Sequence, residues 1–130
     1  MAIVTIKNDT CTAQVDTMGA QLLSMRFDDR EYLWQRDERW WGRTSPILFP
    51  IVGNIRGGEA MSEQGPCHMK QHGVARNYEH RVADVAADGT SVTFELCDSS
   101  ETREQYPYAF RLNMTYALVG EATLAQTFSV

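Results

Sequence analysis

The residue types best suited to chemistry gather in one irregular stretch, residues 45–76. It holds His68 and His72, with arginines at positions 56 and 76. An imidazole exchanges protons near neutral pH, and a guanidinium pairs with carboxylates, phosphates or sugar hydroxyls. Gly73 follows His72 and, without a side chain, permits a ligand to approach the backbone closely. We therefore expect the functional site here. For His72 alone, the alternative is a structural histidine that hydrogen-bonds the backbone.

A metal site is one use for this stretch, because His68 and His72 are four residues apart and Cys67 precedes them. On a strand the two imidazoles would share a face while the thiol points away. No third or fourth ligand is clustered nearby, so we expect no metal. The paired acidic residues, Asp28 with Asp29 and Glu101 with Glu104, lie in polar, turn-like stretches and are interpreted as solvated charges.

Other function classes lack their signature. No serine occupies a nucleophile elbow, and the glycines at positions 53, 57 and 58 match neither the Rossmann nor the Walker spacing. We expect no cofactor. A formal net charge of −5 and a pI near 5.1 argue against nucleic-acid binding, which needs a clustered positive surface.

The cysteines and the apolar runs bear on location. Cys11, Cys67 and Cys97 are odd in number and widely spaced, so a disulfide framework is not expected. The N-terminal apolar stretch is too short for a secretion signal, and no apolar run reaches membrane-spanning length. These features predict a cytoplasmic protein without membrane partners.

Strands must position the irregular stretch, because apolar and polar residues alternate with period two on both sides of it. Asn8-Asp9 and Asp88-Gly89 supply turn chemistry for two hairpins. The longest predicted strand places seven large side chains on one face. The predicted strands span residues 4–7, 12–15, 21–27, 31–34, 78–85, 92–96, 106–118 and 123–130.

The pattern predicts an all-β fold, an antiparallel β-sandwich, formed by residues 1–130 as a single domain. The last strand stops mid-pattern at Val130, so we expect an unpaired sheet edge and a homo-oligomer formed through it. In the loop of residues 35–43, Trp40 and Trp41 are interpreted as a lid over the core. The alternative is an aromatic platform on which a sugar ring stacks.

Two segments, YLWQRDERWWGRTSPILFPIVGNIRGG and MKQHGVARNYEH, resemble the aldose 1-epimerase, or galactose mutarotase-like, family. The similarity is greatest to its bacterial branch of lactose-operon-associated and uncharacterised epimerases. It covers essentially the whole chain, with matching motifs from Gly19-Ala20 to Tyr116. This resemblance implies a β-supersandwich fold. It also implies interconversion of the α and β anomers of an aldose or sugar phosphate, through proton transfer that opens the ring.

The resemblance also implies roles for individual residues. His72 corresponds to the first sugar-contacting histidine and is expected to be catalytic. Asn54 stands where some members carry an arginine, with Arg56 two residues later, and these two residues and Arg76 are expected to bind substrate. The family's second histidine and catalytic glutamate lie beyond this chain. We therefore expect an N-terminal portion with impaired turnover or, alternatively, a non-catalytic carbohydrate-binding or self-associating module.

Overall fold

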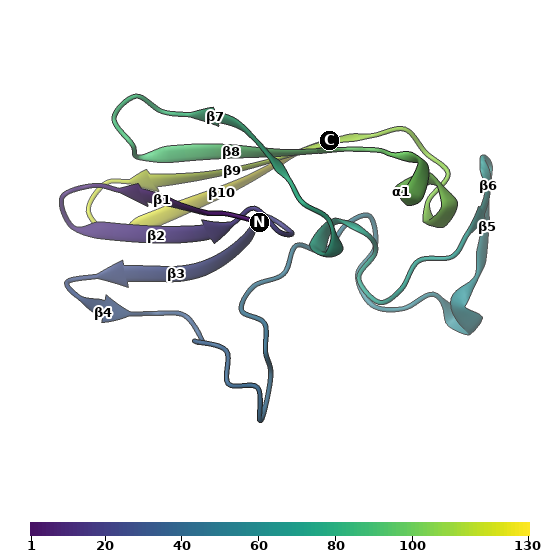
Figure 1. Cartoon of the computed structure of the whole chain (residues 1–130), viewed down its shortest axis with the longest axis horizontal. Helices are drawn as coiled ribbons and strands as arrows, with labels where there is room; N and C mark the ends of the chain where they lie inside the picture. Colours follow the sequence, from purple (N-terminus) through teal and green to yellow (C-terminus); the bar gives the residue numbers. More distant parts are fainter.

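The computed structural model describes residues 1–130 as two four-stranded antiparallel sheets and a two-stranded hairpin. Figure 1 shows the two larger sheets stacked as layers, with an irregular segment and a short helix beside them. The predicted all-β, antiparallel sandwich is confirmed. The first sheet has the order β1-β2-β3-β4 and the second the order β10-β9-β8-β7.

The first sheet comprises β1 (Ile3–Lys7), β2 (Cys11–Asp16), β3 (Gln21–Phe27) and β4 (Arg30–Glu31). Asn8 forms the predicted hairpin turn, because its side-chain oxygen accepts hydrogen bonds from the backbone N–H groups of Thr10 (3.0 Å) and Cys11 (2.7 Å). The predicted strand 31–34 is wrong beyond its first residue. The Glu31 carboxylate accepts the N–H groups of Tyr32 and Leu33 and so draws the chain into a turn.

The second sheet comprises β7 (Arg81–Val85), β8 (Ser91–Cys97), β9 (Arg111–Val119) and β10 (Thr123–Ser129). The predicted strand 106–118 is wrong at its start, because β9 begins only at Arg111. Its partner β8 ends at Cys97, opposite Arg111. Helix α1 (Ser100–Gln105) follows β8, so no neighbouring strand remains for residues 106–110 to pair with.

The main core lies between the two sheets. Fifteen buried side chains from both layers and from the adjoining turns form one cluster. The Tyr116 hydroxyl, inside this core, donates to the backbone oxygen of Ala20 (2.6 Å) and so links the layers. The cluster consists of Ile6, Cys11, Ala13, Val15, Ala20, Leu22, Ile47, Ala75, Val92, Phe94, Leu96, Leu112, Met114, Tyr116 and Leu118.

The irregular stretch contains short elements that the alternation pattern did not predict. These are a 3₁₀ turn η1 (Arg56–Gly58), the hairpin β5 (Ala60–Ser62) with β6 (Gly65–Cys67), and a second 3₁₀ turn η2 (Ala75–Asn77). Cys67, Met69 and Val74 form a small second core, against which Phe49, Tyr106 and Phe110 pack. The only α-helix has six residues and is far too short to cross a bilayer.

The loop between β4 and the irregular stretch does not cover the core. Trp40 and Trp41 are both exposed, so their interpretation as a lid is wrong. Backbone hydrogen bonds from both residues to the Asp37 oxygen turn the loop back on itself. The indoles therefore lie on the surface.

Candidate functional site

His72 is held in one orientation by Gly53. Its backbone N–H donates to the Gly53 oxygen (2.8 Å), and the Gly53 N–H donates to Nδ1 of the imidazole (2.9 Å). Because Nδ1 accepts a hydrogen bond, the neutral ring carries its proton on Nε2. No protein group in the structure bonds to Nε2, so this atom can donate a hydrogen bond to a ligand oxygen.

Gly73 serves a different purpose from the one predicted. Its φ angle is +76°, and a Cβ atom placed there would overlap the Phe49 carbonyl oxygen. That oxygen accepts hydrogen bonds from the N–H groups of Val74 (2.7 Å) and Ala75 (3.2 Å). The backbone of Phe49, rather than a ligand, fills the space beside Gly73, and this contact fixes the loop that carries His72.

An aromatic cluster supports this contact from beneath. The ring of Phe49 lies 5.1 Å from that of Phe110 and 6.4 Å from that of Tyr106, measured between centroids. Helix α1 is linked to the segment before His72 by a hydrogen bond from the His68 N–H to the Gln105 oxygen (2.9 Å). The residues predicted to continue a strand, 106–110, thus serve as packing for the site.

Arg76 has no acidic partner. Its Nε atom is buried without a hydrogen bond, and the structure contains no ion pair to its guanidinium. Arg43 lies beside it and donates to the Arg76 backbone oxygen (3.5 Å) and to Asn77 Oδ1 (3.4 Å). Burial, and secondly the charge of Arg43, lower the pKa of Arg76. A bound anion would relieve both effects.

Arg76 lines two hollows of the surface. One, of about 470 Å³, is also lined by Lys70 and Glu101, and the other, of about 260 Å³, by Arg43 and Asp16. The first falls within the range of about 300–1,000 Å³ usual for small-molecule sites. A larger hollow, about 580 Å³, lies elsewhere between the two hairpin turns and is lined by neither histidine nor arginine.

The other predicted substrate-binding residues are placed differently. Asn54 directly follows Gly53, so it lies next to the backbone that holds His72, and its side chain is exposed. Arg56 begins η1, is exposed and has no ion pair. No hydrogen bond links Arg56 or Arg76 to His72. The roles of these residues therefore remain predictions.

His68 does not join His72. Its Nδ1 atom lies 3.7 Å from the Glu59 carboxylate, and both side chains are exposed. The structure contains no group of three or more His, Cys, Asp or Glu side chains arranged to hold a metal ion.

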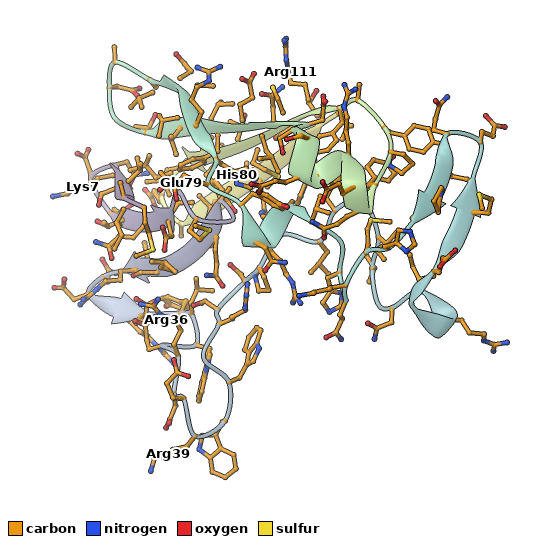
Figure 2. All side chains as sticks on the ribbon, turned by 45° about the vertical axis from the view of Figure 1, so that its right-hand side comes forward. Lys7, Arg36, Arg39, Glu79, His80 and Arg111 are labelled. Atoms are coloured by element: carbon orange, nitrogen blue, oxygen red, sulfur yellow. The ribbon has the colours of Figure 1, made fainter.

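The third histidine, His80, is buried next to Glu79 (Figure 2). Its Nδ1 atom lies 3.0 Å from the Tyr78 oxygen, and Nε2 has no partner. Glu79 accepts a hydrogen bond from the Thr17 hydroxyl (2.5 Å) and pairs with the amino terminus (2.8 Å). The sequence pattern predicted no functional role for His80 or for Arg43. Arg43 approaches Arg76 only through the fold, since 33 residues separate them.

Comparison with known proteins relates this chain to a single family. The family model for aldose 1-epimerase matches residues 2–130. The plasmid-encoded protein LacX of Lactococcus lactis subsp. lactis is 35% identical over 125 residues, covering 92% of this chain and 41% of LacX.

Two solved structures are also similar. A galactose mutarotase related enzyme from Lactobacillus acidophilus has a TM-score of 0.91 at 34% identity, covering 98% of this chain and 42% of that one. A galactose mutarotase-like protein from Lactobacillus casei has a TM-score of 0.91 at 32% identity, covering 98% and 43%. The chain thus spans about two fifths of the length of these relatives.

Proposed function

The chain belongs to the aldose 1-epimerase family, and from this premise we propose that it binds an aldose or aldose phosphate at the loop of His72 and Arg76. In this proposal residues 1–130 form one domain, the N-terminal portion of a cytoplasmic enzyme that interconverts α and β anomers. Its partner is a small-molecule sugar, without nucleic acid, membrane or cofactor. His72 is the catalytic candidate, and Asn54, Arg56 and Arg76 are the substrate-binding candidates.

The hydrogen-bonded pair of Gly53 and His72 carries the proposal. A sugar ring opens when one group takes the anomeric hydroxyl proton and another gives a proton to the ring oxygen, and both groups need fixed positions. The reciprocal bonds fix the imidazole and leave Nε2–H as a donor. One held imidazole supports binding of a sugar oxygen, while proton transfer on both sides of the sugar needs a second group.

We therefore expect the 130-residue chain to bind sugar and to show little or no turnover. Polarimetry of freshly dissolved α-galactose and α-glucose measures turnover, and saturation-transfer NMR with the same sugars measures binding. The expected result is saturation transfer that decreases in His72→Ala, with mutarotation close to the rate without protein. Strong acceleration that disappears in His72→Ala would contradict impaired turnover, and silence in both assays would contradict the proposal itself.

The unpaired guanidiniums favour a sugar phosphate over a free sugar. Arg76 and Arg43 place two positive charges together, and neither guanidinium forms an ion pair. Arginine binds phosphate through two parallel hydrogen bonds. We expect galactose 6-phosphate to bind more tightly than galactose. Arg76→Gln should abolish the difference, whereas Arg56→Gln tests the other candidate arginine and Arg111→Gln, exposed on β9, is the control. Equal affinity for both sugars in the unsubstituted chain would contradict the preference for phosphate.

A second candidate function is self-association without catalysis, since β10 leaves one edge of its sheet unpaired. In this reading the chain is a carbohydrate-binding or self-associating module that forms a homo-oligomer. Edge strands with free backbone donors readily pair with another strand.

A further inference from the structure

All three tryptophans of the chain lie in one loop, residues 34–43, called the tryptophan loop below. The residue of Trp40 is 79% exposed, that of Trp41 47% and that of Trp34 45%. None of the three stacks on another aromatic ring in the structure. Each indole therefore keeps free aromatic surface in contact with solvent, which is unusual for the side chain with the largest apolar area.

The tryptophan loop is ordered by its own hydrogen bonds. The backbone N–H groups of Trp40 and Trp41 donate to the Asp37 oxygen (2.9 and 2.8 Å), and Trp34 Nε1 donates to the Trp41 oxygen (2.8 Å). The Arg39 guanidinium pairs with the Asp37 carboxylate (2.6 Å). Figure 2 shows Arg36 and Arg39 on this loop, which extends away from the sheets. A ligand would find the indoles already positioned and would lose little entropy in ordering them.

Two charged side chains of the tryptophan loop form no ion pair. The Glu38 carboxylate packs against Gly42, where an added Cβ atom would contact its oxygens, and it forms no ion pair. Arg36 is exposed and also has no ion pair. A protein partner covering the loop would have to supply an opposite charge for each of these groups, because burying an unpaired charge is unfavourable. A sugar offers hydroxyls that both accept from a guanidinium and donate to a carboxylate, and its C–H groups suit an indole face.

We propose that the tryptophan loop is a carbohydrate-binding platform, on which a pyranose ring stacks against Trp40 while one of its hydroxyls donates a hydrogen bond to Glu38. This site is separate from the His72 loop and does not depend on anomeric chemistry. It therefore accepts glycosides, whose anomeric carbon is locked, as well as free sugars.

The test uses methyl β-galactopyranoside, because this glycoside cannot open its ring and so cannot report epimerase chemistry. We expect a saturable change in tryptophan emission, together with saturation transfer to the glycoside protons in NMR. Trp40→Ala should weaken binding about tenfold, whereas Trp40→Phe, which keeps an aromatic face, should retain most of it. Glycerol at the same concentration controls for non-specific effects, and circular dichroism checks that the variants are folded.

Several outcomes would overturn the proposal. One is the absence of saturable binding to the unsubstituted chain, and another is unchanged affinity in Trp40→Ala. Emission that depends on protein concentration but not on glycoside would identify a second copy as the partner and would also overturn it. His72→Ala separates the two sites, since it should leave glycoside binding unchanged. Loss of glycoside binding in that variant would place the ligand at His72 and reject the platform.

Discussion

The imidazole of His80 is a residue that the fold removes almost completely from water. It is 1% exposed, and its Nε2 atom has no hydrogen-bond partner. The Tyr78 carbonyl can only accept, so Nδ1 carries the proton of the neutral ring. A second proton on Nε2 would place a charge in a buried position. Burial therefore lowers the pKa of His80, against smaller opposing contributions from the Tyr78 bond and the Glu79 charge.

This lowered pKa predicts acid sensitivity near pH 6. In the unfolded chain the histidine takes up a proton near its ordinary pKa of about 6.5, while the folded chain resists protonation. The free energy of unfolding is therefore fully retained above pH 6.5 and falls as the pH drops below it, by at most about 1.4 kcal/mol per pH unit. Urea denaturation between pH 8 and pH 5 measures this loss.

His80→Asn supplies the control, because its amide N–H can replace Nδ1–H toward Tyr78 but does not titrate. The variant should lose the decrease between pH 6.5 and 5. Carboxylates such as Glu31 and Asp98, whose pKa values are lowered by hydrogen bonds, act only at lower pH. An unchanged decrease in His80→Asn would show that another group is responsible.

The residue types alone were enough to predict His72 and Arg76 as site candidates. Both lie close to Gly73 in a segment without regular alternation. The residue types did not identify Arg43, because its approach to Arg76 depends on how two distant segments fold together. The prediction that a ligand approaches Gly73 was also wrong. A glycine signals a close approach, but the sequence does not say whether a ligand or the backbone of Phe49 makes it.

At the scale of elements, the contact between the Phe49 segment and the His72 loop depends on one missing Cβ atom. Gly73→Ala would force that atom into the Phe49 carbonyl and would place alanine at a positive φ. We expect a loss of about 2–4 kcal/mol in the free energy of unfolding, measured by urea denaturation. The expected structural effect is displacement of the His72 ring, visible as a changed imidazole resonance in NMR.

Gly57→Ala is the matched control. Gly57 also has a positive φ, +71°, but an added Cβ atom meets nothing within 4 Å. Only backbone strain remains, which should cost about 1 kcal/mol. Equal losses in the two variants would mean that strain alone, and not the contact with Phe49, explains the need for glycine at position 73.

The strands that could be predicted are those bounded by residues typical of turns. Asn8 and Asp88 form the turns expected of them. Their hairpins agree with the prediction, except that β7 begins at Arg81 rather than at Tyr78. Helix α1 was missed because it has only six residues, too few for a helical period, although Ser99 and Thr102 form a reciprocal capping box. The alternation over residues 106–110 was misleading, because large aromatic side chains suit a packed cluster as well as a strand.

At the scale of the whole molecule, the outer edges of the two large sheets differ in how they discourage pairing. Strand β4 has only two residues, β1 carries Lys7, and β7 carries Arg81 and Asp84 with an irregular register between Val82 and Asp84. Short length, charge and bulges are the usual protections of an edge strand. Strand β10 has none of them. Its seven residues contain no charge and no proline, and its register with β9 is regular.

This difference predicts that two copies pair through β10. An antiparallel arrangement centred on Gln126 sets Phe128, 52% exposed, opposite Leu124 of the second copy, with no like charges in contact. Light scattering after size exclusion should show a mass that rises with concentration toward twice the 14.7 kDa of the chain. Thr127→Lys, which adds a charge to the exposed edge, should keep the chain monomeric. Thr5→Lys on the already charged β1 should not, and a constant 14.7 kDa mass for the unsubstituted chain would reject the pairing.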